Sequence, residues 1–385
     1  MMSNERVLFV DHTGQIGGAE LILLDVVTSR QNASAFLFET GPLSAALAAR
    51  GLKLIISQHG SGLSRFRRDS SVLSALPLAG RLAAIVVEIA RAAWEHDFVY
   101  ANSQKAFVLA ALANVLVRRP LIWHLHDIIS SAHFGAAQRR MQVLLANMCA
   151  MRVIVPSEAA AAAFVDAGGR RGLVEVVPNG IDLKSERTLR SELRQRFGLP
   201  AGPLVGVFSR LAPWKGQHVL LEALARLPDV GCIIVGDALF GEQDYAARLR
   251  TMTAELGLVD RVHFLGHRND VPSLMQAVDV MVHPSIDPEP FGRTLVEAML
   301  SGVPVIATDA GAAPDILERG RAGTLIPSGD PRALAAAIAS VLTTPEQVAT
   351  QIDYAAQRAR AEYSLGRMLD TIGAVITKVR LGAVA

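Results

Sequence analysis

Short apolar runs rich in β-branched residues alternate with segments of helical periodicity along nearly the whole chain. This alternation is typical of parallel βαβ units, in which helices cover both faces of a sheet. In the first half it predicts strands at residues 6–11, 35–39, 53–56, 98–101, 121–125, 152–155 and 175–177. In the second half it predicts strands at 204–208, 232–235, 262–265, 280–282, 303–307 and 324–326. We therefore expect an α/β fold of two Rossmann-like, doubly wound domains.

A turn-forming cluster, Pro178–Asp182, separates the two halves and is followed by a charged stretch at 184–196. The length of 385 residues also suits two domains of ordinary size. We expect an N-terminal domain at 1–185, a C-terminal domain at 186–364 and a C-terminal helix at 365–385. Because doubly wound sheets bind ligands at the carboxyl ends of their strands, the loops after the strands are where functional residues are expected.

Composition excludes several classes of protein. Hydrophobic residues make up 51% and charged residues 19%, which argues against disorder. The 38 Lys and Arg nearly balance the 36 Asp and Glu, so no strong field favours a nucleic-acid partner. Cys149 and Cys232 lie far apart and fit no ligand spacing, which suits a reducing compartment. The early charges disfavour a signal peptide, and the longest apolar stretches are shorter than the ~20 residues of a membrane span. We expect a cytoplasmic protein with no nucleic-acid partner.

Two loops of the first half carry candidate residues. The first strand is followed by a GxxGG loop, Gly14–Gly18, where a backbone close to a helix start suits phosphate. An ordinary tight turn explains this loop equally well, and the spacing is not the GxGxxG of a dinucleotide site. His124 and His126 stand on the same side of the strand at 121–125. Without a third metal ligand, we assign His126 to an organic ligand and His124 to packing.

The second half offers two cations and two carboxylates. Arg210 and Lys215 follow the strand at 204–208 and can converge on one anion, although solvated surface cations are the alternative. Glu289 lies in a loop bounded by Pro and Gly, and Glu297 lies in the helix that follows. Both carboxylates can accept hydrogen bonds from the hydroxyls of a sugar or ribose. The alternative is a surface loop and a capped helix.

These motifs resemble one known family. They are Glu289-x7-Glu297 with Pro-Phe-Gly between them, Arg210 with Lys215-Gly216, ValProAsnGlyIleAsp at 177–182, PheLeuGlyHis at 264–267 and GlyValProValIleAlaThr at 302–308. Together with the GxxGG loop they resemble the retaining glycosyltransferases of GT-B fold, family 4, also called glycosyl transferases group 1. The resemblance extends to about Pro327.

The resemblance implies a GT-B architecture, with two domains facing a central cleft and a C-terminal helix that crosses back to the N-terminal domain. It implies that Arg210 and Lys215 hold the leaving diphosphate, that Glu289 engages the donor sugar and that Glu297 accepts from the ribose hydroxyls. His126 would lie near the transferring sugar. The other donor-binding residues would be Gly17, Gly18, Gly266, His267, Phe291, Gly292, Arg293 and Thr294. The chain departs from the family at 311–315, where Gly-Ala-Ala-Pro-Asp replaces the usual second glycine and glutamate.

The function implied by the resemblance is retaining, metal-independent transfer of a sugar from a UDP- or GDP-sugar to a glycan, lipid-linked or small-molecule acceptor. No cofactor and no metal site is expected, because the two cations meet the diphosphate charge. A sugar-nucleotide epimerase and a non-catalytic nucleotide-sugar binding protein are the alternatives. The basic run Arg65–Arg68 around Phe66 suggests peripheral contact with an anionic membrane, although such a run is also typical of a solvated face.

Overall fold

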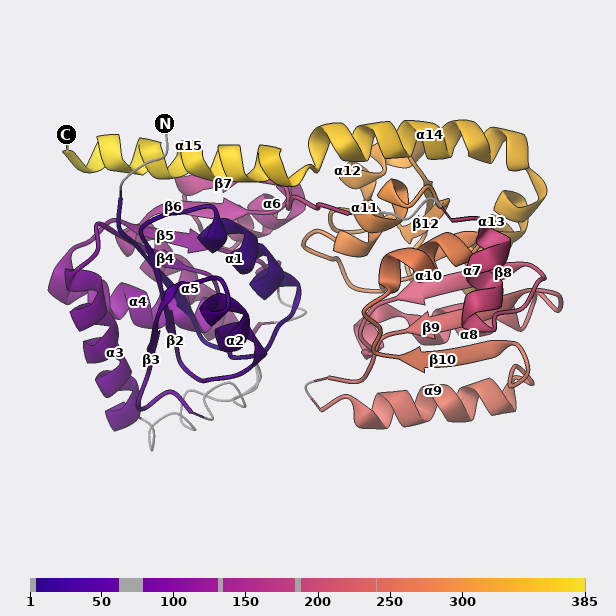
Figure 1. The fold of residues 1–385 in the computed structure, drawn as a ribbon, viewed down its shortest axis with the longest axis horizontal. Helices are drawn as coiled ribbons and strands as arrows, with labels where there is room; N and C mark the ends of the chain where they lie inside the picture. Colours follow the sequence, from indigo (N-terminus) through magenta and orange to yellow (C-terminus); the bar gives the residue numbers. More distant parts are fainter. Residues whose placement is uncertain (1–4, 62–78, 131–133, 184–187, 240, 385) are drawn as a thin grey trace. The chain divides into compact units, whose positions relative to one another are not determined.

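The computed structural model describes residues 5–61, 79–130, 134–183, 188–239 and 241–384 (Figure 1). The chain forms two compact units. The first comprises Met1–Gly180 together with Leu365–Ala385, and the second comprises Ile181–Ser364. The boundary expected near residue 185 falls among residues outside the described ranges.

The first unit is built on a seven-stranded parallel sheet in the order β3-β2-β1-β4-β5-β6-β7. Its strands are β1 (Val7–Asp11), β2 (Ala33–Leu37), β3 (Lys53–Ile56), β4 (Phe98–Ala101), β5 (Leu121–His124), β6 (Ala150–Val155) and β7 (Val174–Val176). Its helices are α1 (Gly18–Thr28), α2 (Pro42–Ala48), α3 (Ala79–Trp94), α4 (Gln104–Val117), α5 (Ala136–Cys149), α6 (Glu158–Asp166), η3 (Arg171–Leu173) and α15 (Leu365–Val384).

The second unit repeats this plan with a six-stranded parallel sheet in the order β10-β9-β8-β11-β12-β13. Its strands are β8 (Leu204–Phe208), β9 (Gly231–Val235), β10 (Val262–Gly266), β11 (Val280–His283), β12 (Val305–Thr308) and β13 (Thr324–Ile326). Its helices are α7 (Arg190–Phe197), η4 (Pro213–Lys215), α8 (Gln217–Leu224), α9 (Gln243–Glu255), α10 (Val271–Ala277), α11 (Arg293–Leu300), α12 (Ala313–Ile316), η5 (Glu318–Gly320), α13 (Pro331–Thr343) and α14 (Pro345–Glu362).

Both sheets thus confirm the expected α/β fold of two Rossmann-like, doubly wound domains. Strand limits differ from the sequence prediction by a few residues. The strand predicted from residue 303 begins at Val305, because Gly302 has a positive φ of 71° and Pro304 has no N–H to donate to a neighbouring strand. The β-propensity of the sequence did not show at which residue the hydrogen bonds between strands begin.

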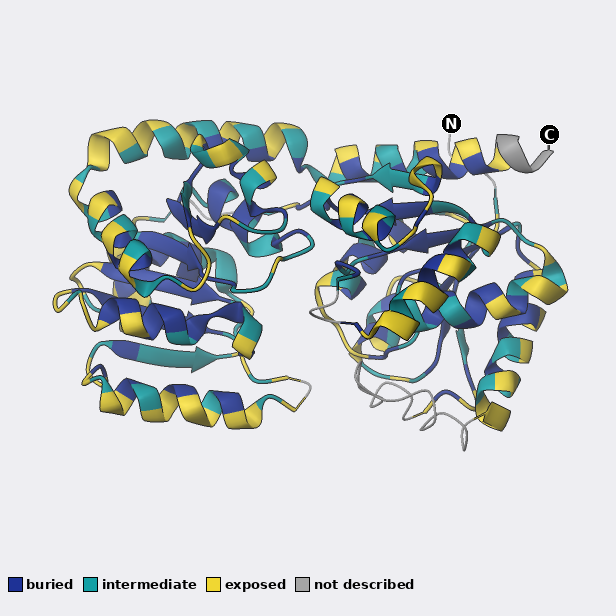
Figure 2. Ribbon diagram, turned by 180° about the vertical axis from the view of Figure 1, so that it is seen from behind, coloured by how far each residue is buried: buried dark blue, intermediate teal, exposed yellow. Residues whose placement is uncertain are grey.

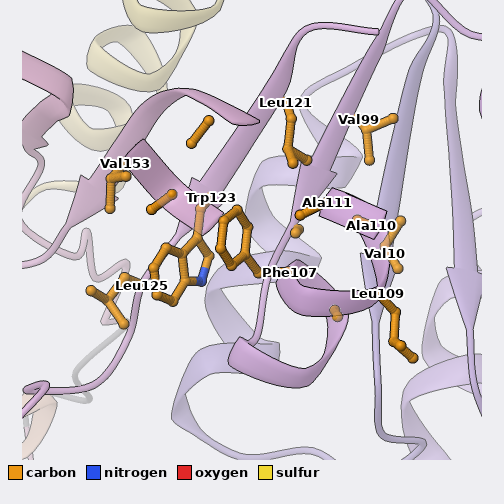
Figure 3. Packing of buried hydrophobic residues seen from close by; sticks show 14 of the residues in the cluster. Val10, Val99, Phe107, Leu109, Ala110, Ala111, Leu121, Trp123, Leu125 and Val153 are labelled. Carbon is orange, nitrogen blue, oxygen red and sulfur yellow. The ribbon is translucent and has the colours of Figure 1, made fainter. Parts of the chain in front are cut away.

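The core of the first unit has one apolar layer on each face of its sheet. On one face the indole of Trp123 is fully buried and stacks on Phe107 of α4, with ring centroids 4.1 Å apart (Figure 3). Val10 of β1 and Leu125, which follows β5, complete this layer. Figure 2 shows that the strands are mainly buried, whereas most helices also carry exposed residues.

Helix α15 contributes to the apolar layer on the other face of the first sheet. Its buried residues recur every three or four positions, as an amphipathic helix requires. They are Met368, Ile372, Val375, Ile376 and Val379, and they share a cluster with Phe9 and residues of α1. The last helix is therefore part of the hydrophobic core of the first unit. No described helix combines the length and the apolar character that a membrane crossing requires.

Replacing Ile372 by Ala should destabilise the first unit by about 2–5 kcal/mol, because it leaves a cavity beside a fully packed sheet. Hydrogen exchange measured by mass spectrometry should show lower protection in β1 and β4 and unchanged protection in β8. Lys378→Ala on the same helix removes only an exposed ion pair with Glu175 and serves as the control. Unchanged protection of β1 in the Ile372 variant would contradict this account of α15.

Candidate functional site

The candidate residues of the second unit gather where the strand order of its sheet changes direction. Strands β8 and β11 are neighbours there although β9 and β10 lie between them in sequence. Doubly wound sheets bind ligands at such a switch point, because the loops after the two strands diverge and leave a crevice. Arg210 and Lys215 follow β8, while His283 ends β11 and Glu289 follows it.

A buried ionic cluster surrounds the carboxylate of Glu289. One carboxylate oxygen pairs with Nζ of Lys215, and the other pairs with Nε2 of His283. Oγ of Ser285 lies 3.2 Å from Nε2 of His283 and 3.5 Å from the same oxygen of Glu289. The side chains of Lys215, His283 and Glu289 are 9%, 5% and 14% exposed, so little water screens these charges.

The electrostatics of the cluster favour an ionised Glu289. Burial by itself raises the pKa of this carboxyl, but Lys215 and His283 outweigh burial and lower the pKa overall. The pKa of Lys215 is lowered by burial and by Arg210, although Glu289 opposes this shift. An anionic hydrogen-bond acceptor and a cation therefore stand side by side at the strand ends.

Trp214 brings the two predicted cations together. Nζ of Lys215 lies 4.3 Å from the centroid of this indole, and Cζ of Arg210 lies 5.3 Å from it. Both distances fall within the range of cation–π attraction. The structure thus gathers Arg210 and Lys215 around one ring, and it pairs Lys215 with Glu289, a contact that the sequence did not predict.

Two glycines let neighbouring loops approach the loop that carries Glu289. A Cβ on Gly216, at φ +70°, would lie 1.9 Å from the carbonyl oxygen of Pro284. A Cβ on Gly311, at φ +62°, would lie 2.4 Å from the backbone of Glu289. The backbone N–H of Ala312 donates to the carbonyl oxygen of Glu289 at 3.0 Å. The segment that departs from the family pattern is therefore the one that packs against Glu289.

The start of α11 carries four of the predicted donor-binding residues. Gly292, at φ +80°, precedes the helix, and the first helical residues are Arg293 and Thr294. The hydroxyl of Thr294 lies 3.4 Å from Nδ1 of His283, which links the helix to the Glu289 cluster. The side chain of Phe291 is only 4% exposed and packs in the core, so only its backbone can face a ligand.

Glu297, Gly266 and His267 have surroundings different from those of Glu289. Glu297 pairs with Arg293 one turn earlier at 3.4 Å, and burial raises its pKa. Gly266 has a φ of 66°, and the side chain of His267 is exposed. The two glutamates are thus held by different partners.

In the first unit, three strand ends bring together a polar chain that includes His126. Asp11 ends β1, Asn102 follows β4, and His126 follows β5. The amide nitrogen of Asn102 donates to Asp11 at 2.7 Å, and its carbonyl oxygen lies 2.9 Å from Nε2 of His126. This chain also lies at a switch point, because β1 and β4 are neighbours in the sheet.

The two histidines differ in exposure. His124 is 1% exposed, its Nδ1 lies 2.7 Å from the hydroxyl of Tyr100, and its ring centroid lies 3.9 Å from that of His126. His126 is half-buried. Burial lowers the pKa of His126 to about 4 and that of His124 well below its usual value. Both imidazoles are therefore neutral near pH 7.

A buried carboxyl group occupies the helix start beside the GxxGG loop. The N–H of Gly17 donates to the carboxylate of Glu20 at 2.8 Å, and α1 begins at Gly18. Burial and the nearby charge of Asp11 raise the pKa of Glu20 to about 7. The N–H of Gly17 can meet a phosphate only when this carboxylate moves away.

Sequence reasoning did not assign roles to several of these residues. The missed residues are Asp11, Glu20, Asn102, His283 and Ser285. Four of them are among the first polar residues at the carboxyl end of a strand, which is a signal that could have found them. Glu20 stands three residues after Gly17, at the capping-box position of α1. Within the described ranges, no three His, Cys, Asp or Glu side chains cluster as metal ligands would. The basic run at 65–68 lies outside those ranges.

Comparisons with known proteins identify the family of the chain. The family model for glycosyl transferases group 1 matches residues 190–358, and that for glycosyltransferase family 4 matches residues 67–185. The 2-deoxystreptamine glucosyltransferase of Streptomyces kanamyceticus is 34% identical over 48% of this chain and 49% of its own length. The lipopolysaccharide core biosynthesis mannosyltransferase LpsB of Rhizobium meliloti is 29% identical over 58% of this chain and 65% of its own length. The chain thus spans about half to two thirds of these curated relatives.

A solved structure is similar over the whole chain. The crystal structure of Anabaena HepE in complex with UDP-glucose is 40% identical and has a TM-score of 0.88. The similarity covers 97% of this chain and 100% of that one. HepE therefore shares both the fold and the sequence pattern over both units.

The raised pKa of Glu20 predicts a pH-dependent loss of stability. Between its ordinary value of 4.5 and about 7 the folded state holds a proton that the unfolded state releases, so the free energy of unfolding falls as pH rises through this window. Glu20→Gln keeps the cap without the charge. The difference between the Tm of this variant and the Tm of the parent should therefore increase in favour of the variant from about pH 5 to about pH 8.

Glu158→Gln provides the matched control, because Glu158 also lies in the first turn of a helix but is exposed. Its Tm should follow that of the parent at every pH. A Glu20 variant whose Tm also follows the parent at every pH would show that Glu20 is not the group that titrates.

Proposed function

Because the chain belongs to the glycosyl transferases group 1 family, we propose that it transfers a sugar from a nucleotide diphosphate sugar to an acceptor hydroxyl. The single observation that carries the proposal is the buried cluster of Lys215, His283 and Glu289 at the switch point of the second sheet. The donor is a UDP- or GDP-sugar. UDP-glucose is the first candidate, because HepE, whose structure contains it, is similar over nearly the whole chain.

The proposed role of Arg210 and Lys215 is to stabilise the leaving diphosphate. Negative charge develops on this group as the bond between sugar and phosphate breaks. Preorganised cations stabilise that charge as it forms, and loss of one such donor costs about 3–4 kcal/mol. The burial of Lys215 strengthens its interaction with a phosphate, because little water screens its charge. In this proposal the reaction needs no metal and no cofactor.

The proposed role of Glu289 is to accept hydrogen bonds from hydroxyls of the donor sugar. Its lowered pKa keeps it anionic, and an anionic acceptor binds hydroxyls more strongly than a neutral one. The backbone of Phe291, Gly292, Arg293 and Thr294 would bind the sugar and the phosphate at the start of α11. We infer retention by a front-face route, in which a phosphate oxygen of the donor takes the proton of the acceptor hydroxyl.

The remaining site residues are proposed to bind different parts of the donor. Glu297 would accept from the ribose hydroxyls, and the backbone near Gly266 and His267 would hold the base. Gly17 and Gly18 would approach the diphosphate or the acceptor, and His126 would contact the transferring sugar.

The acceptor is proposed to be a glycan, a lipid-linked sugar or a small molecule, in a cytoplasmic step of polysaccharide biosynthesis. Several classes of acceptor are proposed because the relatives include a 2-deoxystreptamine glucosyltransferase and a lipopolysaccharide core mannosyltransferase. Peripheral contact with an anionic membrane would involve residues 65–68.

The function is tested by incubating the protein with UDP-glucose or GDP-mannose and a panel of acceptors in excess EDTA. We expect a donor that raises the Tm, release of nucleoside diphosphate that depends on the acceptor, and a product that keeps the donor's anomeric configuration. Interconversion of the sugar nucleotide without an acceptor would instead indicate an epimerase. Activity that appears only with Mg²⁺ or Mn²⁺ would overturn the metal-independent mechanism.

Substitutions of the two glutamates should affect different quantities, namely kcat for Glu289 and UDP affinity for Glu297. Glu289→Gln should lower kcat strongly and leave UDP affinity nearly unchanged, because the proposed contacts of Glu289 are with the transferring sugar. Glu297→Ala should weaken UDP binding by about 1.5–3 kcal/mol, the value of a charge-assisted hydrogen bond. Isothermal titration with UDP and initial rates with UDP-glucose measure both effects. Equal loss of UDP affinity in the two variants would show that the roles are assigned wrongly.

A further inference from the structure

The side-chain amide of Asn102 can adopt only one of its two orientations. Its Nδ2 lies 2.7 Å from a carboxylate oxygen of Asp11 and 3.4 Å from the carbonyl oxygen of Ala19. A carboxylate and a carbonyl accept hydrogen bonds but do not donate them. The amide nitrogen must therefore occupy this side, and the amide oxygen must face Nε2 of His126 at 2.9 Å.

Asp11 fixes this orientation because it is held as an acceptor. The carboxylate is fully buried, and its other oxygen accepts from the backbone N–H groups of His12 at 2.6 Å and Thr13 at 3.2 Å. Burial raises the pKa of Asp11, but the ring of His12, whose Nδ1 lies 3.2 Å from the same oxygen, and the hydrogen bonds from Asn102 and Thr13 lower it overall. Asp11 stays ionised and has no proton to donate.

The orientation of Asn102 in turn fixes the tautomer of His126. The amide oxygen only accepts, so Nε2 of His126 must carry the proton. Because burial lowers the pKa of His126 to about 4, the ring has only this one N–H near pH 7. Nδ1 then keeps its lone pair.

We propose that Asp11 and Asn102 are positioning residues that hold His126 in its Nε2–H tautomer, so that Nδ1 accepts a hydrogen bond from a hydroxyl of the transferring sugar. This inference rests on the proposed contact between His126 and the sugar. The opposite tautomer would present an N–H at the same place, which could donate to that hydroxyl but could not accept from it. The chain from Asp11 to His126 therefore sets the direction of the hydrogen bond between His126 and the sugar.

The proposal is tested by determining the tautomer of His126 by NMR. The full chain is labelled with 15N in its histidine rings and is measured without donor. Ring nitrogens that carry a proton resonate apart from those that carry a lone pair, and a spectrum of His126→Gln identifies the signals of His126. In the parent, Nε2 should be protonated. In Asp11→Asn, a donor amide replaces the acceptor at residue 11, so Asn102 should rotate and the signals of the opposite tautomer should appear.

Two further variants complete the design. Asn102→Ala removes the link and should also give a mixture of tautomers, which keeps the idea testable if Asp11→Asn does not fold. Asp279→Asn makes the same chemical change in the second unit, where Asp279 accepts from Arg194 and from the backbone of Leu204, and should leave the His126 signals unchanged. A single Nε2–H tautomer in folded Asp11→Asn and Asn102→Ala would overturn the proposal.

The kinetic readout separates this inference from the proposed function. Both test variants should lower kcat/KM for the donor about fivefold or more, the value of one neutral hydrogen bond. A tautomer shift without any change in kcat/KM would overturn the proposed role of Nδ1 as an acceptor for the sugar hydroxyl. An absence of glycosyl transfer in the parent would refute the function and leave the NMR result standing.

Discussion

The parallel pairing of β8 with β11, and of β1 with β4, is the constraint on which the candidate sites depend. Each pair joins strands that are distant in sequence, so the loops that follow them arrive at one sheet edge from opposite directions. The loop after β8 brings Lys215, and the loop after β11 brings Glu289. The first sheet repeats the arrangement with Asp11 and Asn102. The residues of each pair are distant in sequence, and the pairing of the strands brings them together.

The ion pair between Lys215 and Glu289 is costly to form and therefore informative. Burying two charges removes them from water, and their attraction offsets this penalty only when the geometry is good. Apolar residues of similar size would stabilise the second unit at least as well. A buried, charged pair at the carboxyl ends of two central strands is better explained by a ligand that exchanges partners with it. Perturbed pKa values at such an edge point the same way.

The sequence predicted the fold well and the site in part. Strand and helix periodicity identified both sheets, because apolar burial decides those patterns directly. Glu289, Lys215 and His126 could be selected as candidates from the sequence, since each lies in or near a loop that follows a predicted strand. The contact between Lys215 and Glu289 could not be predicted from the sequence, because it depends on which strands are neighbours. The role of Asn102 was missed for a related reason. It depends on the contacts of its side-chain amide with Asp11 and His126, which are distant in sequence.

Helix α15 has a consequence for how the chain folds as it is made. Five of its residues lie in the core of the first unit, although more than 180 residues of the second unit are synthesised between them and the rest of that core. Domains usually fold as units, with the N-terminal one first during translation. Here the second unit, which is continuous in sequence, can close while the first still lacks part of the apolar layer on one face of its sheet. The core of the first unit is complete only after α15 has emerged from the ribosome, so the unit whose synthesis begins first receives its last core residues after the second unit has been made.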